Sequence, residues 1–379
     1  MIPTHRPAWR TAAVVATAAL ISTLAAPSAA FADTVIPFTD SALQGCVELA
    51  LGLPHGSGVT TTDILDLTSL SCTSSEVENV FPLSHATNLV TLDLDDNNIR
   101  SISGLTKLAN LTDLRLRDNL LLDSLPKLSG MTSLDFLLLD HNNLSDVSSL
   151  SGLKSTMSYL SLTGNYVRSV SSLSSFSSIG HLWLDDNMIL DLSPLKNLSS
   201  GLVYFDGTGQ HRISPDITLN SPVSVPKVTR PSGSHPTISV SSASSAKGKI
   251  AKGKVTWTTV GSGILKWNTT FGIGANGTGK FSGTVDRETF HKMKTTKPVI
   301  TGTRAVGHTL KVSTKGWTSN VDKIYEWVSG NDTVQVDSHS SYKLHKSDKG
   351  KRIRVYVFGY RAHYLSVTRV SGTTGKISG

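Results

Sequence analysis

Two glycine-rich stretches have the spacing of phosphate-binding loops. Residues 272–277 read GIGANG and match G-x-G-x-x-G, while residues 274–280 (GANGTGK) come close to a P-loop. Phe281 stands where a P-loop needs Ser or Thr for magnesium, and the following KFSGTV favours a strand. Because bound phosphate needs the N–H groups of a helix N-terminus, neither match predicts nucleotide binding. A hairpin with Asn276-Gly277 at its turn is the better interpretation.

Other chemistry is not indicated either. DLDDNN (93–98) has the start of a calcium loop, but Asn98 replaces the required glycine. The 12 histidines form no metal-ligand spacing, and no G-x-S-x-G elbow is present. The sequence therefore predicts no enzyme, no cofactor and no metal site. A dispersed catalytic triad is the alternative that one sequence leaves open.

The leucines follow a repeat of 22 to 23 residues. The pattern L-x-x-L-x-L-x-x-N fits five units, and its last position is occupied by Asn97, Asn119, Asn142, Asn165 and Asn187. Partial units begin at Leu67 and Leu202, and the latter ends at Gln210. One unit cannot bury its own leucines, but a stack can. Each asparagine amide is expected to bond backbone groups at a turn. The pattern predicts a leucine-rich-repeat solenoid over 67–214.

Positions around the two strand leucines of each unit are expected to line the concave side of that solenoid. Alternate strand side chains point to opposite faces, so Leu182 and Leu184 go inside and Trp183 points out. A one-residue shift in register would reverse this arrangement, and a neighbouring chain could cover the surface. Clustered aromatic side chains with charged margins are typical of binding hot spots. The predicted ligand-binding residues are Arg115, Arg117, Phe136, Leu138, Tyr159, His181, Trp183, Asp185 and Tyr204.

Residues 1–32 have the features of a signal peptide. Arg6 and Arg10 precede an apolar run at 11–26, and Ala30-Phe31-Ala32 fits a cleavage site. The run is too short for a membrane span, although a retained anchor helix is the alternative. We expect an exported protein that begins near Asp33.

A helical cap is expected over 33–66. SALQGCVELALGL (41–53) reads as an amphipathic helix that would cover the open N-terminal end of the solenoid core. Export places Cys46 and Cys72, the two cysteines of the chain, in an oxidising compartment. A disulfide between them would join the helix to the first repeat. Two buried free thiols are the alternative.

The repeat and its flanks resemble the internalins, which are surface and secreted proteins of Gram-positive bacteria. The resemblance rests on DLSPLKNL (191–198), on the cap phrase IPFTDSALQGCVELALGL (36–53) and on Gln210 in the last repeat. ITLNSPVSVP and GTGKFSGTV are similar to the immunoglobulin-like inter-repeat domain of that family, which implies such a domain over 215–294. The family implies a host-cell or other protein receptor as ligand.

The last segment, 295–379, resembles an immunoglobulin-like repeat common in secreted actinobacterial surface proteins. Its YEWV (325–328) and GKRIRV (350–355) motifs carry this resemblance, and Trp317, Tyr325, Trp327 and Tyr356 are expected in its core. The predicted fold class is mixed. It consists of a parallel-sheet solenoid with a helical cap, followed by two all-β immunoglobulin-like sandwiches.

Charge divides the chain into two parts. Residues 1–209 hold 10 basic and 20 acidic side chains, a balance of −10, and residues 210–379 hold 26 and 8, a balance of +18. Scattered lysines in an exported chain favour an anionic cell-wall polymer over nucleic acid as partner, or serve solubility alone. No wall-sorting motif or hydrophobic tail follows, so we expect a secreted protein, soluble or held non-covalently at the wall.

These observations predict a non-enzymatic recognition or adhesion protein. Its ligand would be a macromolecule, preferably a protein, bound on the concave face. The alternative is a module that binds a glycan or a cell-wall polymer, with the aromatic rings stacked on sugars.

Overall fold

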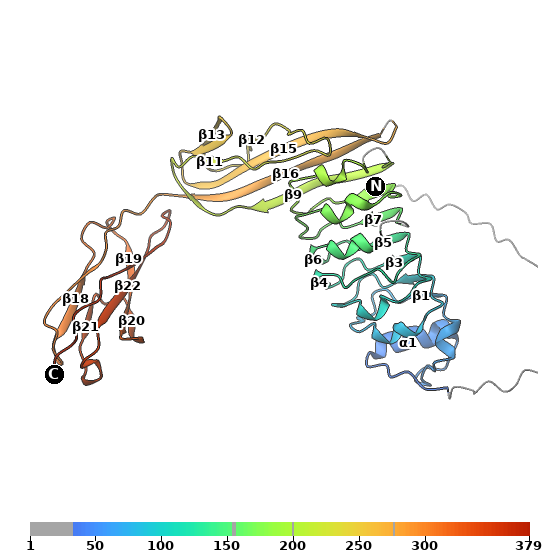
Figure 1. Ribbon diagram of the computed structural model, residues 1–379, viewed down its shortest axis with the longest axis horizontal. Coiled ribbons are helices and arrows are strands. Elements are labelled where there is room, and N and C mark those ends of the chain that lie inside the picture. The colour runs from blue at the N-terminus through green and yellow to red at the C-terminus, as the bar shows by residue number, and fades with distance from the viewer. Residues whose placement is uncertain (1–32, 154–156, 199–200, 276) are drawn as a thin grey trace, which may run out of the picture.

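The computed structural model describes residues 33–153, 157–198, 201–275 and 277–379. The predicted signal peptide and Asn276 of the predicted hairpin turn lie outside these residues. The described chain is elongated, with the repeats at one end, a long β-hairpin in the middle and a separate group of strands at the C-terminal end (Figure 1).

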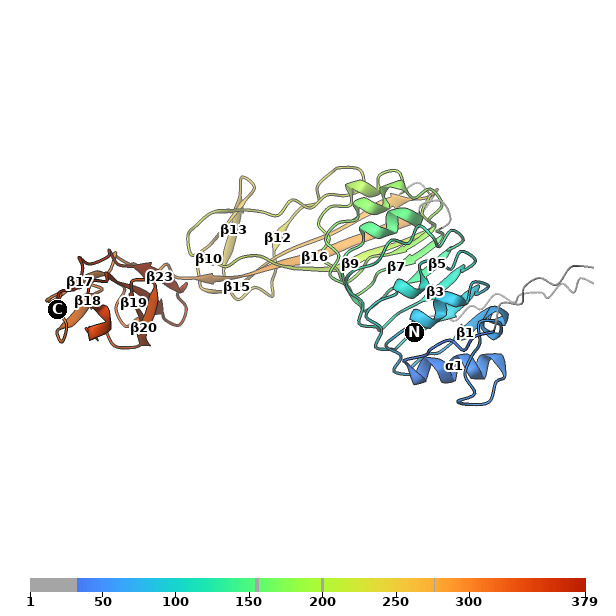
Figure 2. The same cartoon turned by 60° about the horizontal axis from the view of Figure 1, so that its bottom comes forward.

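The repeats form a solenoid whose strands pair in parallel. The central residues of consecutive strands are direct partners, as in Leu137 with Leu160 and Leu160 with Leu182. Short 3₁₀ helices stack along the other side of the coils (Figure 2). The strands are β1 (Ser69–Ser71), β2 (Thr91–Asp93), β3 (Asp113–Arg115), β5 (Phe136–Leu138), β7 (Tyr159–Ser161), β8 (His181–Trp183) and β9 (Tyr204–Ile213). The return segments contain η1 (Asp63–Asp66), η2 (Phe81–His85), η3 (Ser103–Leu105), β4 (Leu122–Ser124), β6 (Asn143–Asp146), η4 (Ser148–Leu153), η5 (Ser171–Ser175) and η6 (Ser193–Leu195).

The repeat leucines form one continuous core. Leu182 and Leu184 are fully buried, as are their counterparts in the other coils. The predicted register is therefore confirmed, and the alternative shift by one residue is wrong. Each buried leucine contributes roughly 1.5–3 kcal/mol from apolar burial, which no single coil could obtain alone.

A row of side-chain amides, here called the amide ladder, joins each coil to the next. In Asn142, Nδ2 donates to the carbonyls of Leu116 at 2.8 Å and Leu139 at 3.1 Å, while Oδ1 accepts from the N–H of Leu121 at 3.1 Å. Gln210 repeats this pattern in the last coil, as the sequence predicted. The members are Asn97, Asn119, Asn142, Asn165, Asn187 and Gln210, all at most 6% exposed.

The residue before each ladder amide, and before Ser75 at the same position of the first coil, has a left-handed backbone. Its φ runs from 49° to 70° in seven successive coils. Gly, Asp and His tolerate this conformation better than β-branched residues do. The residues concerned are Ser74, Asp96, Asp118, His141, Gly164, Asp186 and Gly209.

Helix α1 (Ser41–Leu51) lies at the N-terminal end of the solenoid (Figure 1). The Asp40 carboxylate accepts from the N–H of Leu43 at 3.0 Å and caps the helix start, and Gly52 ends it with φ 68°. Leu43 and Val47 are buried in the same core as the repeat leucines. A disulfide joins Cys46 on α1 to Cys72, directly after β1, as predicted.

The solenoid sheet continues into the next part of the chain. Strand β9 pairs in parallel with β16 (Gly277–Phe290), which pairs along its whole length with β15 (Gly261–Ile273). The sheet thus crosses the predicted boundary between 214 and 215. A Cβ at Gly283 would collide with the backbone of Gln210, so glycine permits the close approach of β16 to the last coil.

The described residues of the two glycine-rich motifs lie at the end of β15 and at the start of β16. Strand β16 begins at Gly277, where a phosphate-binding loop would instead open a helix. Strands β10 (Ile217–Thr218) and β12 (Ser239–Val240) pair with β16 and β15. A small separate sheet contains β11 (Val223–Ser224), β14 (Lys254–Trp257) and β13 (Gly248–Ala251).

The C-terminal strands form two sheets around Trp327. Trp327 and Tyr325 are buried there and Trp317 packs against them, as expected. The prediction that Tyr356 lies in the core is wrong. Its side chain is half-buried on the outer face, with Arg354 over its ring. The neighbouring Val355 and Val357 point inward, so Tyr356 points outward. One sheet has β17 (Val299–Thr301), β18 (Thr309–Ser313) and β21 (Ser341–Lys343), and the other has β20 (Asp332–Asp337), β19 (Asp322–Ser329), β22 (Ile353–Tyr360) and β23 (Val367–Val370). The 3₁₀ helix η7 (Lys346–Asp348) precedes β22.

Candidate ligand-binding face

The outward side chains of the solenoid strands form a surface here called the strand face. Its outward positions are the first and third residue of each of the strands β1, β2, β3, β5, β7, β8 and β9, together with the second residue after that third one. Phe136, Tyr159, His181 and Tyr204 are direct partners in successive strands. Trp183 is the partner of Ser161 on one side and of Asp206 on the other. The repeat register thus brings together the columns that the sequence predicted.

The rings of these columns form a continuous aromatic row: Phe136, Tyr159, His181, Trp183 and Tyr204. Tyr159 and His181 stack with centroids 4.1 Å apart and planes within 5°. Trp183 lies 5.1 Å from Tyr204 on the far side. Tyr204 is 43% exposed, but the other rings are half-buried because they cover one another. They are less open to solvent than their outward positions alone would suggest, and they are also more rigid.

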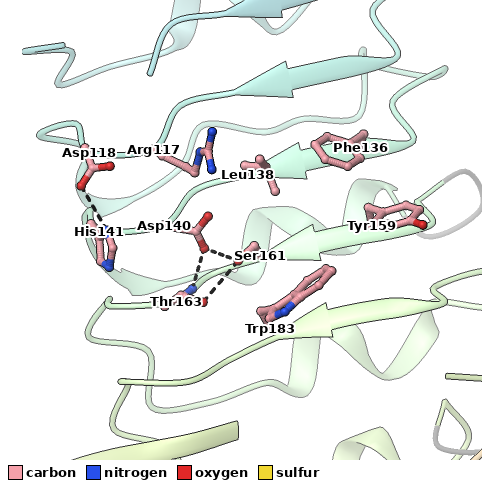
Figure 3. A pocket seen from close by; sticks show the side chains of 10 residues that line it. All are labelled: Arg117, Asp118, Phe136, Leu138, Asp140, His141, Tyr159, Ser161, Thr163 and Trp183. Carbon is pink, nitrogen blue, oxygen red and sulfur yellow. Dashed lines mark hydrogen bonds and ion pairs between the residues drawn. The ribbon is translucent and has the colours of Figure 1, made fainter. Parts of the chain in front are cut away.

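A hollow of about 480 Å³ opens beside the aromatic row. Figure 3 shows its rings at one side and its charged and hydroxyl side chains at the other. Five of the predicted residues line it, namely Arg117, Phe136, Leu138, Tyr159 and Trp183. Five more that were not selected from the sequence also line it, namely Asp118, Asp140, His141, Ser161 and Thr163.

The other predicted residues lie on the same face beside the hollow. The Arg115 guanidinium is 5.2 Å from the centre of the Phe136 ring. Asp185 accepts a 2.9 Å hydrogen bond from the hydroxyl of Thr163, a lining residue. His181 and Tyr204 belong to the aromatic row. All nine predicted residues are therefore on one surface, and the hollow marks its centre.

Both arginines are neutralised by aspartates of the same face. Arg117 donates from Nε to Asp95 at 2.8 Å and its Nη2 lies 2.6 Å from the same carboxylate. Arg115 pairs with Asp113 at 2.9 Å. Hydrogen bonding to these carboxylates raises the pKa of each guanidinium above its ordinary value. These two cations are held in place within the face.

Asp140 and Asp185 are two acidic groups of the strand face, and only Asp185 is among the residues predicted from the sequence. Asp140 is only 9% exposed, and one of its oxygens accepts from the Ser161 hydroxyl and from the N–H of Thr163. Burial raises the pKa of both Asp140 and Asp185. Burial also lowers the pKa of His181, so its neutral form is favoured beside Tyr159.

Asp118 and His141 are the site residues that sequence reasoning missed. Their side chains contact each other through His141 Nδ1 and Asp118 Oδ1 at 3.0 Å. Both occupy the left-handed position before the amide ladder, which turns them toward the rim of the face. Gly164 follows in the next coil, and a Cβ there would strike the His141 ring. The recurrence of Asp, His and Gly one residue before each ladder amide is the signal that could have found them.

The described ranges contain no group of three or more His, Cys, Asp or Glu residues that could hold a metal ion. Among the helices in those ranges, none is both long and apolar enough to cross a membrane.

Among known proteins, similarity was found only to solved structures. No family model matches the chain, and no curated protein matches it. Internalin C2 of Listeria monocytogenes is 28% identical over 49% of this chain and 90% of its own, with a TM-score of 0.38. A secreted internalin-like protein of Listeria monocytogenes is 16% identical over 65% and 94%, with a TM-score of 0.44.

A leucine-rich-repeat protein of Leptospira interrogans is 21% identical, covers 40% of this chain and 46% of its own, and has a TM-score of 0.32. These similar structures are internalins and a leucine-rich-repeat protein, in agreement with the resemblance that the sequence predicted. Because the TM-scores lie below 0.5, the likeness carries no argument about function, which must come from the strand face itself.

Proposed function

We propose that this protein recognises another macromolecule, preferably a protein, through the concave side of its solenoid, where the strand face lies. The observation that carries the proposal is the aromatic row beside a hollow of about 480 Å³. Leucines supply the core and amides supply the turn bonds, so the fold itself has no use for five rings on its outer surface. No catalytic step is proposed.

The composition of this surface supports binding rather than stability. Rigid aromatic side chains offer large contact area at little cost in rotamer entropy. Interface hot spots are enriched in Trp, Tyr and Arg and are surrounded by residues that exclude water. Trp183 and Tyr159 line the hollow as such anchors, and Arg117 is held at its margin by Asp95.

The remaining parts fit a surface or secreted protein. We propose that α1 caps the first coil, that 215–294 and 295–379 are immunoglobulin-like units carrying the solenoid, and that residues 1–32 direct export. The +18 balance of residues 210–379 would let these units bind an anionic wall polymer. That retention should collapse as the salt concentration rises, and retention unchanged in high salt would remove the charge argument.

The alternative ligand is a glycan. The parallel stacking of Tyr159 on His181 leaves flat ring surfaces of the kind that sugar rings contact. A screen of the full-length protein against a glycan array and against cell-surface proteins distinguishes the two ligand classes.

The screen is to be run with Trp183→Ala and with Phe81→Ala. Phe81 is 61% exposed in η2, on the helical side of the solenoid, and is therefore the matched control. We expect Trp183→Ala to lose the captured ligand and Phe81→Ala to keep it. Binding of Trp183→Ala equal to that of the parent protein would refute the proposed face.

A further inference from the structure

We propose that the hollow of the strand face binds a basic side chain, arginine or lysine, of a protein ligand. This inference rests on the proposed function and names the chemistry that the surface would recognise.

Charge is the first observation. From residue 91 to residue 208 the outward positions of the strand face hold six aspartates and two arginines, a formal balance of −4. Both arginines are bound to aspartates of the same face. In the part of the chain that the structure describes, Asp140, Asp185 and Asp206 have no basic partner within ion-pair distance. The face therefore has aspartates that are not paired with a basic residue, while both of its arginines are already paired.

The placement of Asp140 is the second observation. This carboxylate is about nine-tenths buried, and both of its hydrogen bonds, from Ser161 and Thr163, go to one oxygen. Its other oxygen makes no hydrogen bond within the described residues, and the side chain lines the hollow (Figure 3). This second oxygen faces the hollow and is free to accept a hydrogen bond, so an incoming guanidinium or ammonium would donate a charge-assisted hydrogen bond to it.

The rings are the third observation, independent of the acidic groups. The Arg115 guanidinium already lies over Phe136, so this row accepts a guanidinium in the chain itself. Tyr159 and Trp183 line the hollow, and no described lysine or arginine lies over either ring. A cation between these rings and Asp140 would gain from the ring quadrupoles and from the carboxylate together. A neutral sugar would stack on the rings and donate hydroxyl hydrogen bonds, but it would leave the acidic charge of the face uncompensated.

The test uses the full-length protein and a pair of matched peptides. The probe is the acetylated, amidated peptide Gly-Gly-Arg-Gly-Gly, and its control contains citrulline, which has almost the same shape but no charge. Binding is followed by the indole N–H resonance of Trp183, assigned with Trp183→Phe. We expect the arginine peptide to move this resonance saturably and to bind at least tenfold more tightly than the citrulline peptide.

Variants sharpen the test. Asp140→Asn should weaken the arginine peptide at least fivefold and leave the citrulline peptide unaffected. Asp186→Asn is the matched control, because it removes the same charge from an exposed turn residue outside the hollow, and it should bind like the parent protein.

Three results would overturn the inference. They are equal affinity for the arginine and citrulline peptides, no movement of the resonance up to about 10 mM peptide, or movement with the neutral trisaccharide cellotriose in place of the arginine peptide. Any of these results could occur while Trp183→Ala still loses the macromolecule captured in the screen. The proposed function would then stand, and only the basic-side-chain inference would be wrong. If instead the arginine peptide binds as expected but Trp183→Ala captures the macromolecule like the parent protein, the proposed function is refuted.

Discussion

The amide ladder and the aromatic row are two rows of the same solenoid, built by the same repeat. Every member of the ladder is an amide, is buried and donates to carbonyls of its own coil and of the coil before it. The aromatic row changes from Phe136 to Tyr159 to His181 and is half-buried. One row is constant and satisfies backbone groups, while the other varies and contacts solvent.

The difference shows where a repeat constrains its sequence. An amide is needed wherever backbone N–H and C=O groups would otherwise be buried without partners. The outward strand positions carry no such demand, so they are free to hold rings and charges that the fold does not use. The rings of the strand face therefore support the proposed binding function, whereas the amides of the ladder support stability.

The largest expected effect comes from removing the disulfide at the start of the amide ladder. The carbonyl of Cys72 accepts the first ladder bond, from Asn97 at 2.8 Å, and its side chain is tied to α1 by the disulfide. Replacing both Cys46 and Cys72 by Ser should cost about 3 kcal/mol, because it frees a loop of 26 residues in the unfolded chain. Urea unfolding measures this, and a variant as stable as the parent would deny the anchoring role of α1.

A smaller loss is expected within the ladder. Asn142→Ala removes three donated bonds and one accepted bond, and should destabilise the protein by about 1–3 kcal/mol. The neighbouring Asn143 is half-buried and outside the ladder, so Asn143→Ala should change stability far less. Hydrogen exchange of the coils around residue 142 in urea compares the two. Equal losses would mean that position in the ladder does not matter.

Local patterns explain why so much of the solenoid could be predicted. Leu182 and Leu184 fixed the direction of Trp183, and Gln210 could be placed in the ladder by its spacing alone. The pairing of β9 with β16 could not be predicted, since residues 204–213 and 277–290 meet only in three dimensions. Tyr356 was assigned to the core because its aromatic character outweighed strand alternation in the interpretation.

The candidate site was predicted in position but not in detail. The columns of Tyr159 and Trp183 follow from the register, which the sequence contains. The hollow and the burial of Asp140 depend on how neighbouring side chains stack, which the repeat pattern does not encode. Asp118 and His141 were missed because their direction depends on a left-handed φ, which the leucine pattern does not reveal.

The smallest expected effect is a pH dependence of ligand binding, which separates the two rows because the strand face has titratable groups with shifted pKa values and the ladder has none. Burial raises the pKa of Asp140 and Asp185, so protonation of these groups favours the folded state. The stability that they contribute is present at low pH and is lost as the pH rises through their raised pKa values. The negative charge of these two groups, which the arginine peptide would bind, is instead lost as the pH falls.

Affinity for the arginine peptide should therefore decrease severalfold when the pH falls from 7 through the raised pKa values of these two aspartates. The double variant Asp140→Asn with Asp185→Asn should bind weakly at every pH. Titrations of the peptide across the pH range check this. A decrease of the same size in the double variant would assign the effect to another group.

The central claim is that the aromatic row, and not the exposed surface in general, binds the ligand. The most direct measurement is the affinity of the captured macromolecule for Tyr159→Ala beside Phe81→Ala, with both variants shown to unfold like the parent. The arrangement of rings around the hollow predicts at least a tenfold loss, about 1.4 kcal/mol, for Tyr159→Ala and no change for Phe81→Ala. Equal affinity of the two variants would contradict the claim.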